Sequence, residues 1–170
     1  MLLEDSRQQA GKHKHIEQWM VAHGVDFAPR ATALPFGDYM VEGSNISIDT
    51  KKDMQEVVGN IGRDHARFVR ECERAREEGY RLIILIEEHP EYNDRHRLYA
   101  WKNGVCRRCR RCDPLTSPKC KRYRSKPMCG KTAARIIQKI ESNHGARFEF
   151  CRKRDTARRI CEILGVKYRE

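Results

Sequence analysis

The stretch Arg81-Leu82-Ile83-Ile84-Leu85-Ile86-Glu87 decides the fold class of this chain. A continuous apolar run of this length, bounded by charged residues, is typical of a β-strand that is covered on both faces. Such coverage is supplied by helices packed on either side of a sheet. We therefore expect an α/β architecture in which a mixed central β-sheet is flanked by helices.

Helical and extended patterns alternate on both sides of this strand. Upstream, residues 1–5 predict a short strand, 11–23 a helix, 36–41 and 46–51 a hairpin, and 53–79 one long amphipathic helix. Residues 25–33 give no clear pattern, because Pro29 is unfavourable in a central strand. Downstream, the patterns predict a helix over 132–143, a strand over 146–151 and a helix over 155–164.

Length and charge limit the class of protein. The 170 residues suit one domain, and 35 basic against 24 acidic side chains give a net charge of +11. This charge favours a polyanionic partner, with nucleic acid first and an anionic membrane surface second. No run of 18 apolar residues occurs, and Glu4 and Asp5 lie where a secretory signal would be apolar, so membrane spanning and secretion are not expected.

The positive charge is concentrated in one segment, residues 101–131. Eleven basic residues face Asp113 alone there, a net charge of +10, which leaves +1 for the other 139 residues. Three prolines interrupt any periodic pattern in the segment. We interpret it as a basic, cysteine-rich insertion carried by an otherwise near-neutral domain that spans residues 1–170.

The hairpin carries residues that suit metal chemistry. A four-residue loop over 42–45 pairs Tyr39 with Ile48 and brings Asp38 opposite Asp49. Strand alternation places Asp49 and Lys51 on one face. Two carboxylates forced together are destabilising unless a cation neutralises them, and Mg²⁺ binds through a pair of carboxylates. The alternative is that Asp38 is a turn residue and that the other two side chains line a solvated face.

Three segments together resemble a known family of nucleases. They are Leu34-Pro35-Phe36-Gly37-Asp38-Tyr39, Ile48-Asp49-Thr50-Lys51-Lys52-Asp53 and the strand over 82–87. They are similar to the L-P-x-G-D-Y, E-R-K-x-x-x-D and I-L-L-I-E elements of the nuclease domain in XPF-type structure-specific endonucleases, which belong to the P-D-(D/E)-x-K fold. Asp5-Ser6-Arg7-Gln8 resembles the family's D-x-R-E start, with Gln8 in place of the acid.

The resemblance implies a restriction-endonuclease-like fold and a set of site residues. Asp38 and Asp49 would ligate Mg²⁺ or Mn²⁺ together with the Thr50 carbonyl, Asp5 would support a second ion or a water, and Lys51 would help to activate the nucleophile. Arg7 of the same motif is expected to contact DNA. The role of Asp53 stays open, since it follows Lys51 too closely for the family's spacing and also suits a helix cap.

The resemblance also implies an activity. We expect a metal-dependent endonuclease that hydrolyses branched, flap or junction DNA, similar to stand-alone members in bacteria and phages. It would act in the cytoplasm, at the nucleoid or in a phage-infected host, and family members can form homodimers through this domain. Two alternatives are an inactive nucleic-acid-binding protein that keeps the nuclease fold and a restriction-type nuclease.

Five cysteines of the insertion form a second candidate site. Their spacing includes two consecutive C-x2-C units, and without a secretory signal metal ligation is favoured over disulfides. Structural Zn²⁺ is one hypothesis, an iron–sulfur cluster a second, and unligated thiols in a flexible loop a third. The residues are Cys106, Cys109, Cys112, Cys120 and Cys129.

The arginines and lysines between these cysteines are expected to contact DNA phosphates, unless the loop is merely solvated. Trp101 and Tyr123 could stack on bases. Outside the insertion, His13 and His15 are expected at the surface. The predicted phosphate contacts are Arg107, Arg108, Arg110, Arg111, Lys121, Arg122 and Arg124.

Overall fold

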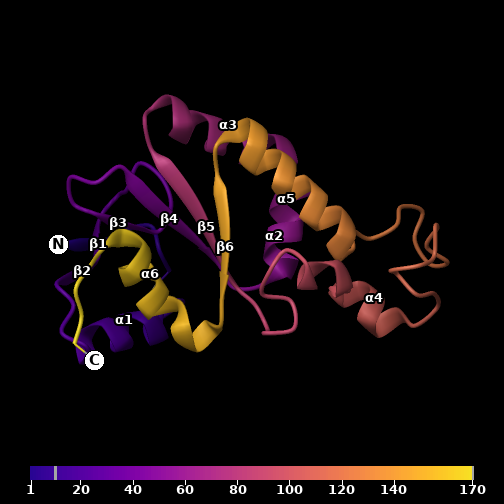
Figure 1. Ribbon diagram of the computed structural model, residues 1–170, viewed down its shortest axis with the longest axis horizontal. Coiled ribbons are helices and arrows are strands. Elements are labelled where there is room, and N and C mark those ends of the chain that lie inside the picture. Colours follow the sequence, from indigo (N-terminus) through magenta and orange to yellow (C-terminus); the bar gives the residue numbers. More distant parts are fainter. Residues whose placement is uncertain (10, 170) are drawn as a thin grey trace.

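The chain forms one six-stranded mixed sheet with helices on both faces (Figure 1). The structure is a computed structural model and describes residues 1–9 and 11–169. In sheet order the strands are β2 (Phe27–Thr32), β1 (Leu2–Asp5), β3 (Tyr39–Val41), β4 (Ile46–Lys51), β5 (Arg81–Glu87) and β6 (Arg147–Cys151). The helices are α1 (Lys14–Ala22), α2 (Met54–Ile61), α3 (His65–Glu77), α4 (Gly104–Cys109), α5 (Gly130–His144) and α6 (Thr156–Leu164), with 3₁₀ turns η1 (Arg97–Ala100) and η2 (Lys153–Asp155).

Strand β5 is an interior strand, as its sequence predicts. It pairs in parallel with β4 on one side and with β6 on the other. Ile83 and Leu85 belong to the core that α1 and α6 cover, whereas Leu82, Ile84 and Ile86 belong to the core under α2, α3 and α5. Both faces of the strand are therefore dry, which confirms the expected α/β class with a mixed sheet between helical layers.

The hairpin register is also confirmed. Tyr39 pairs with Ile48 and Met40 with Ser47. Strand β3 is antiparallel to β1 and β4, and the remaining pairs are parallel. The carboxyl ends of β1, β4, β5 and β6 therefore meet at one edge of the sheet, where β3 begins. Open α/β sheets bind their ligands at this kind of edge.

The predicted long helix over 53–79 is wrong in one respect, because it is two helices. Gly62 ends α2 with φ −104° and ψ −92°, and Asp64 starts α3. A Cβ at position 62 would lie 2.7 Å from the carbonyl oxygen of Val58, so this bend requires glycine. The predicted cap is confirmed, since the Asp53 carboxylate accepts a hydrogen bond from the backbone of Glu56 at 2.8 Å.

Residues 25–33, for which the pattern was unclear, form the edge strand β2. It pairs only with β1 among the described strands, in parallel. An edge position tolerates Pro29, which has no N–H to offer to a second neighbour.

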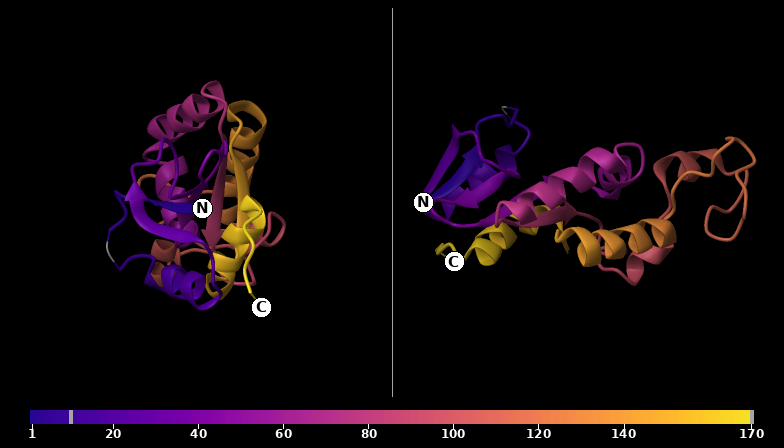
Figure 2. Two further views of the ribbon diagram at one scale, coloured as in Figure 1. Left: turned by 90° about the vertical axis from the view of Figure 1, so that its left-hand side faces the viewer. Right: turned by 90° about the horizontal axis from the view of Figure 1, so that it is seen from above.

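The basic segment projects from one end of the molecule. Helix α4 and the loop to α5 extend away from the sheet, whereas both termini lie at the opposite end (Figures 1 and 2). A hydrogen bond of 2.9 Å from the Gly104 N–H to the Gln55 side chain ties the base of the segment to α2. Trp101 lies in the core at 1% exposure, so its predicted stacking role is wrong: the indole fills space beneath α5.

None of the helices described over residues 1–9 and 11–169 combines the length and the apolar character that a membrane crossing requires.

Candidate active site

Asp38 lies at the sheet edge where β3 begins. Its backbone N–H donates to the Ile48 carbonyl at 2.6 Å, which fixes it beside β4. One carboxylate oxygen accepts hydrogen bonds from the Thr50 N–H at 2.8 Å and from the Thr50 hydroxyl, and the other accepts one from the Gln8 amide. Asp38 is 8% exposed, so three donors compensate for the water that its carboxylate has lost.

Asp49 and Lys51 form a largely buried ion pair next to Asp38. The ammonium lies 2.7 Å from the carboxylate, and the side chains are 14% and 12% exposed. The interpretation as a solvated face is therefore wrong. Burial raises the pKa of Asp49 to about 6, with contributions from the charges of Asp38 and Glu71, while Lys51 opposes the shift. Burial alone lowers the pKa of Lys51, but Asp49 outweighs it and the net shift is upward.

We expect Lys51→Met to lower the free energy of unfolding by about 3 kcal/mol at pH 7.5, because it leaves a buried carboxylate without its partner. The loss should be smaller at pH 5. The pKa of Asp49 is raised from 3.8 to about 6, so the folded protein binds a proton that the unfolded chain releases. Stability from this group therefore falls as the pH rises through that window. Urea denaturation at the two pH values measures the difference.

Lys139→Met, which removes an exposed lysine from α5, serves as the control and should change stability little at either pH. An equal loss at both pH values for Lys51→Met would contradict the assignment of the pair.

The Asp5 carboxylate is bound by Arg7 and by the backbone of Leu34. The Asp5 carboxylate accepts hydrogen bonds from the Arg7 N–H at 2.6 Å, from the Arg7 guanidinium at 2.9 Å and from the Leu34 N–H at 3.0 Å. Burial raises the pKa of Asp5, but these hydrogen bonds and the charge of Arg7 outweigh it, so the net shift is downward. The structure thus ties the Asp5 carboxylate to Arg7 and Leu34, while the Asp5 backbone N–H donates to the Asp38 carbonyl at 2.9 Å and places Asp5 beside Asp38 in the sheet.

A buried hydrogen-bonded network, which sequence reasoning missed, runs beneath the site. The Tyr39 hydroxyl donates to Glu4 at 2.9 Å and lies 2.8 Å from His13 Nδ1. His13 Nε2 lies 3.4 Å from the Thr50 hydroxyl, which in turn bonds to Asp38. Burial and the Glu4 charge raise the pKa of Tyr39. The predicted surface position of His13 is wrong, because it is 6% exposed and satisfies groups from two strands.

Two acidic residues were also missed. Glu71 of α3 is one of the charges that raise the pKa of Asp49. Glu87 ends β5, accepts a hydrogen bond from the Thr156 hydroxyl at 2.8 Å and lies 3.2 Å from His15 Nε2. The position of Glu87 carried a signal, since functional groups gather where buried parallel strands end. Glu71 carried none, because its approach depends on how α3 crosses the sheet.

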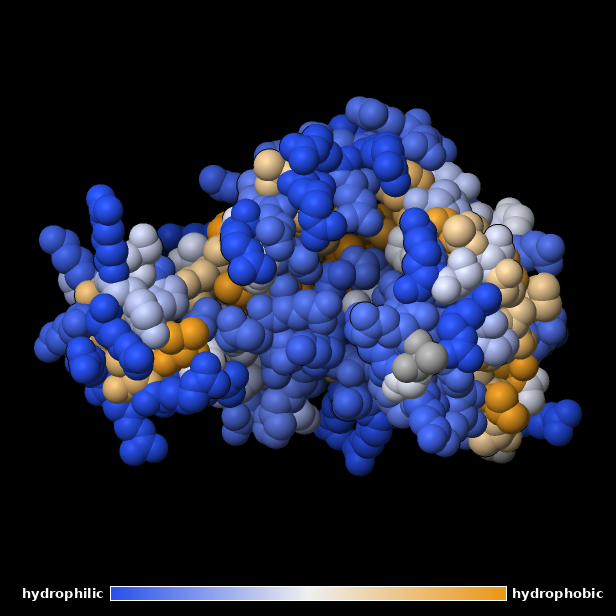
Figure 3. All heavy atoms as spheres, turned by 180° about the vertical axis from the view of Figure 1, so that it is seen from behind, coloured by the Kyte–Doolittle hydropathy of each residue, from blue (hydrophilic) through white to orange (hydrophobic). Residues whose placement is uncertain are grey.

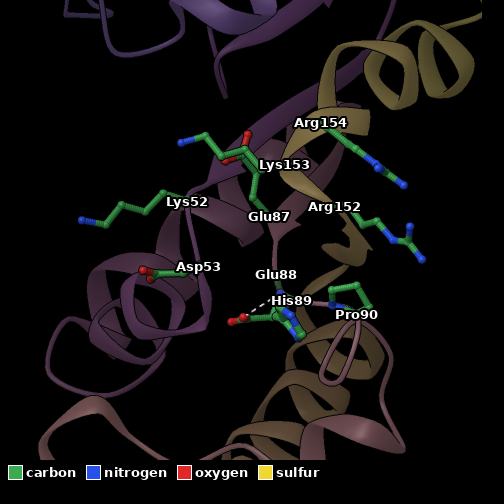
Figure 4. Close-up of a pocket in the computed structure, with 9 residues that line it drawn as sticks. All are labelled: Lys52, Asp53, Glu87, Glu88, His89, Pro90, Arg152, Lys153 and Arg154. Atoms are coloured by element: carbon green, nitrogen blue, oxygen red, sulfur yellow. Dashed lines mark hydrogen bonds between the residues drawn. The ribbon is translucent and has the colours of Figure 1, made fainter.

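A cavity of about 540 Å³ opens at the same edge, between the start of α2 and the turn after β6 (Figure 4). Lys52 and Asp53 approach it from one side, and Arg152 and Arg154 lie on the other. Figure 4 also shows Glu88 and His89 at one end of the cavity, where the His89 backbone N–H donates to the Glu88 carboxylate at 2.8 Å. The lining thus carries charges of both signs.

Among the cysteines of residues 101–131, three lie close enough to Cys106 to affect its pKa, although no three described thiols are placed to hold one metal ion. Burial raises the pKa of Cys106, and the thiols of Cys120, Cys112 and Cys109 add to the shift. The Cys120 sulfur accepts backbone hydrogen bonds from residues 122 and 123 at 3.4 and 3.3 Å, which lower its pKa. Cys129 differs: it is buried at the start of α5, beside Thr132 at 3.8 Å.

The predicted phosphate contacts of the insertion are all exposed. Figure 3 shows a mostly hydrophilic surface over the projecting part. Tyr123 is 40% exposed and packs under the Arg122 guanidinium, whose carbon lies 5.2 Å from the ring centre. The exposed residues are Arg107, Arg108, Arg110, Arg111, Lys121, Arg122 and Arg124.

Two comparisons bear on this geometry. No protein-family model matches the chain, and a search of curated proteins finds no significant match. Within residues 1–9 and 11–169, no group of three or more His, Cys, Asp or Glu side chains is placed to hold a metal ion. The structure does bring Asp38, Asp49 and Lys51 together, and Asp5 lies beside Asp38 on the neighbouring strand, whereas the five cysteines of residues 101–131 lie outside that group.

Proposed function

We propose that this protein is a metal-dependent endonuclease that hydrolyses phosphodiester bonds in DNA, of the XPF type and with a restriction-endonuclease-like sheet. The observation that carries the proposal is the position of Asp38, Asp49 and Lys51. All three lie where parallel strands end, and the desolvated carboxylate of Asp49 lies within reach of the charge of Asp38. Carboxylates whose pKa is shifted by burial and by a neighbouring charge are typical of catalytic sites.

The donor set fits Mg²⁺ or Mn²⁺. Mg²⁺ is bound through one or two carboxylates and keeps waters and substrate phosphate oxygens in its other positions, so it needs no group of three protein ligands. Asp38 and Asp49 would hold it. When bound, the ion supplies an activated water and stabilises charge on the phosphate. The like charges of the two carboxylates are a cost that a cation removes.

The remaining residues orient the Asp38 carboxylate, supply positive charge or hold neighbouring segments in place. Thr50 and Gln8 hold the Asp38 carboxylate by hydrogen bonds. Gln8, which stands in place of the acid of the D-x-R-E element, thus orients another acid, Asp38. Lys51, fixed by its ion pair, is placed to donate to a phosphate oxygen or to the attacking water. In this proposal Asp5 keeps Arg7 and the Leu34 segment in place beside the site.

The projecting segment would bind DNA away from the site that cuts it. The seven arginines and lysines predicted to contact phosphates are all exposed, and phosphate neutralisation is their natural use. A contact set at one end of an elongated molecule suits a branched or flapped substrate, whose arms diverge from the cleavage point (Figure 2).

We propose Zn²⁺ as the ligand of Cys106, Cys109, Cys112 and Cys120, without Cys129. Support comes from the two consecutive C-x2-C units, from the effect of the other three thiols on the pKa of Cys106 and from the two N–H groups directed at the Cys120 sulfur. The four thiols are not gathered around one point in the described residues, so zinc would have to draw them together. Anaerobically purified protein is expected to contain one zinc per chain, and Cys120→Ser should lose it while Cys129→Ser retains it. Protein without zinc or iron would contradict the proposal; iron would point to a cluster instead.

A cleavage panel tests the proposed function. Duplex, single-stranded, flap, fork and four-way-junction DNA are incubated with Mg²⁺, with Mn²⁺ or with EDTA. We expect cleavage of branched substrates that EDTA abolishes. Tight binding of the same substrates without cleavage in either metal would instead support the inactive nucleic-acid-binding protein.

A further inference from the structure

A second, smaller cavity at the sheet edge is surrounded by lysines. Its volume is about 160 Å³, and it lies between the start of α1 and the ends of β4 and β5. Lys12, Lys51, Lys52 and Lys153 line it together with His15 and Glu87. We call this cavity the lysine pocket. Four lysines from three segments of the chain thus line one small space.

The charges around the lysine pocket do not cancel. Glu87, 8% exposed, is engaged by the Thr156 hydroxyl at 2.8 Å and by His15 at 3.2 Å. Lys51 is paired with Asp49. In the part of the chain that the structure describes, no carboxylate lies within 4.0 Å of the ammonium groups of the other three lysines. The pocket therefore has an excess of positive charge that an anion would balance.

Helix geometry adds to this excess. The first turn of α1, a helix of nine residues, opens onto the pocket through His13 and His15, so the positive end of its dipole faces the same space. The pocket holds about half the volume of the smallest usual ligand sites, which begin at about 300 Å³. It has room for a phosphate group but not for a whole nucleotide.

The lysine pocket adjoins the proposed catalytic residues through the end of β4. Thr50, whose hydroxyl bonds to Asp38, lines the pocket, and so does Lys51, which is paired with Asp49. On the other side, Lys52, Glu87 and Lys153 also line the larger cavity of Figure 4, which continues along the edge. An anion in the pocket would thus lie next to the cutting site rather than at the projecting segment.

We infer that the lysine pocket is a phosphate-binding subsite that seats one backbone phosphate of the DNA close to the bond that is cut. This inference rests on the proposed function for the identity of the substrate, but the phosphate site itself does not. The subsite would fix the register of the strand in the site, whereas the projecting segment would bind the remainder of the substrate.

The test compares two variants that remove the same charge. Lys12→Gln/Lys153→Gln changes the pocket, and Lys139→Gln/Lys167→Gln removes two exposed lysines elsewhere. Binding of inorganic phosphate is followed by phosphorus NMR, and binding of a labelled 20-base-pair duplex by anisotropy in EDTA, which keeps the DNA intact. The pocket variant should weaken both Kd values at least tenfold and the control less than twofold.

Salt dependence gives a second readout. Losing one phosphate contact should reduce the slope of log Kd against log salt by about 0.9. Equal weakening by both variants would overturn the inference, because it would show a general charge effect. A duplex without its 5′-phosphate should bind as the phosphorylated one does; a tenfold loss would assign the pocket to a terminal phosphate and overturn the backbone assignment.

Failure of the proposed function is distinguishable from failure of the pocket. If the parent protein binds phosphate in the expected pattern but cuts no DNA in the cleavage panel, the phosphate site stands and the endonuclease proposal falls. If it cuts DNA and the pocket variant binds phosphate as the parent does, the reverse holds.

Discussion

Replacing Asp49 by asparagine is expected to reduce metal-dependent DNA cleavage at least about a thousandfold. A bound divalent ion supplies several kcal/mol of transition-state stabilisation, and about 4 kcal/mol corresponds to this factor. The amide keeps the shape of the side chain but cannot donate a full negative charge to the metal. Single-turnover cleavage of the best substrate from the panel, in Mg²⁺, measures the loss.

The same variant should remain folded. Burial disfavours the ionised form of Asp49, as its raised pKa indicates, so a neutral amide at this position should keep the fold, with a loss of stability because the largely buried Lys51 ammonium loses its partner. Asp26→Asn is the matched control, because it makes the same chemical change on a side chain that is 81% exposed and lies outside the site. A loss below tenfold for Asp49→Asn would mean that this carboxylate is not a metal ligand.

Gly37→Ala is expected to lower the free energy of unfolding by about 2–5 kcal/mol. Gly37 has φ +64°, and a Cβ there would lie 2.6 Å from both the Ile48 carbonyl oxygen and the Ser47 hydroxyl. The cost combines the left-handed backbone, about 1–2 kcal/mol, with overpacking, about 1–3 kcal/mol. The clash also displaces the neighbouring Asp38, so cleavage should fall together with stability. Denaturant unfolding and single-turnover cleavage measure the two effects.

Gly43→Ala separates the two causes. Gly43 lies in the hairpin loop with φ +77°, but a Cβ there meets nothing within 4 Å. It should therefore cost only the backbone term, about 1 kcal/mol, and leave cleavage unchanged. If both glycine variants lose the same stability, the close approach at Gly37 has no energetic importance.

Local patterns sufficed for the interior strand and for the hairpin. The apolar run over 82–86 is suited only to a strand that is covered on both faces. The turn residues over 42–45 fix the pairing of Tyr39 with Ile48. The break between α2 and α3 was not predictable, because apolar spacing continues across it. It depends on the contact that a side chain at Gly62 would make with the preceding turn.

The site was predictable only where neighbours in the chain are neighbours in space. Asp38, Asp49 and Lys51 follow from strand alternation within one hairpin. His13, which precedes α1, and Glu71 of α3, whose charge acts on Asp49, are positioned by tertiary packing, and their own segments carry no sign of it. The stacking role of Trp101 was predicted wrongly for the same reason. An aromatic residue in a basic segment suggests base stacking, but Trp101 packs in the hydrophobic core.

The network from Glu4 through Tyr39, His13 and Thr50 to Asp38 makes these positions interdependent in evolution. Each hydroxyl or ring nitrogen takes its donor or acceptor role from its neighbour, and Glu4 has no exposure to solvent that could supply a substitute. A single exchange leaves a buried polar atom without a partner, while a matched pair of exchanges does not. Substitutions along this network should therefore be accepted in compensating sets, and its members should show epistasis with one another.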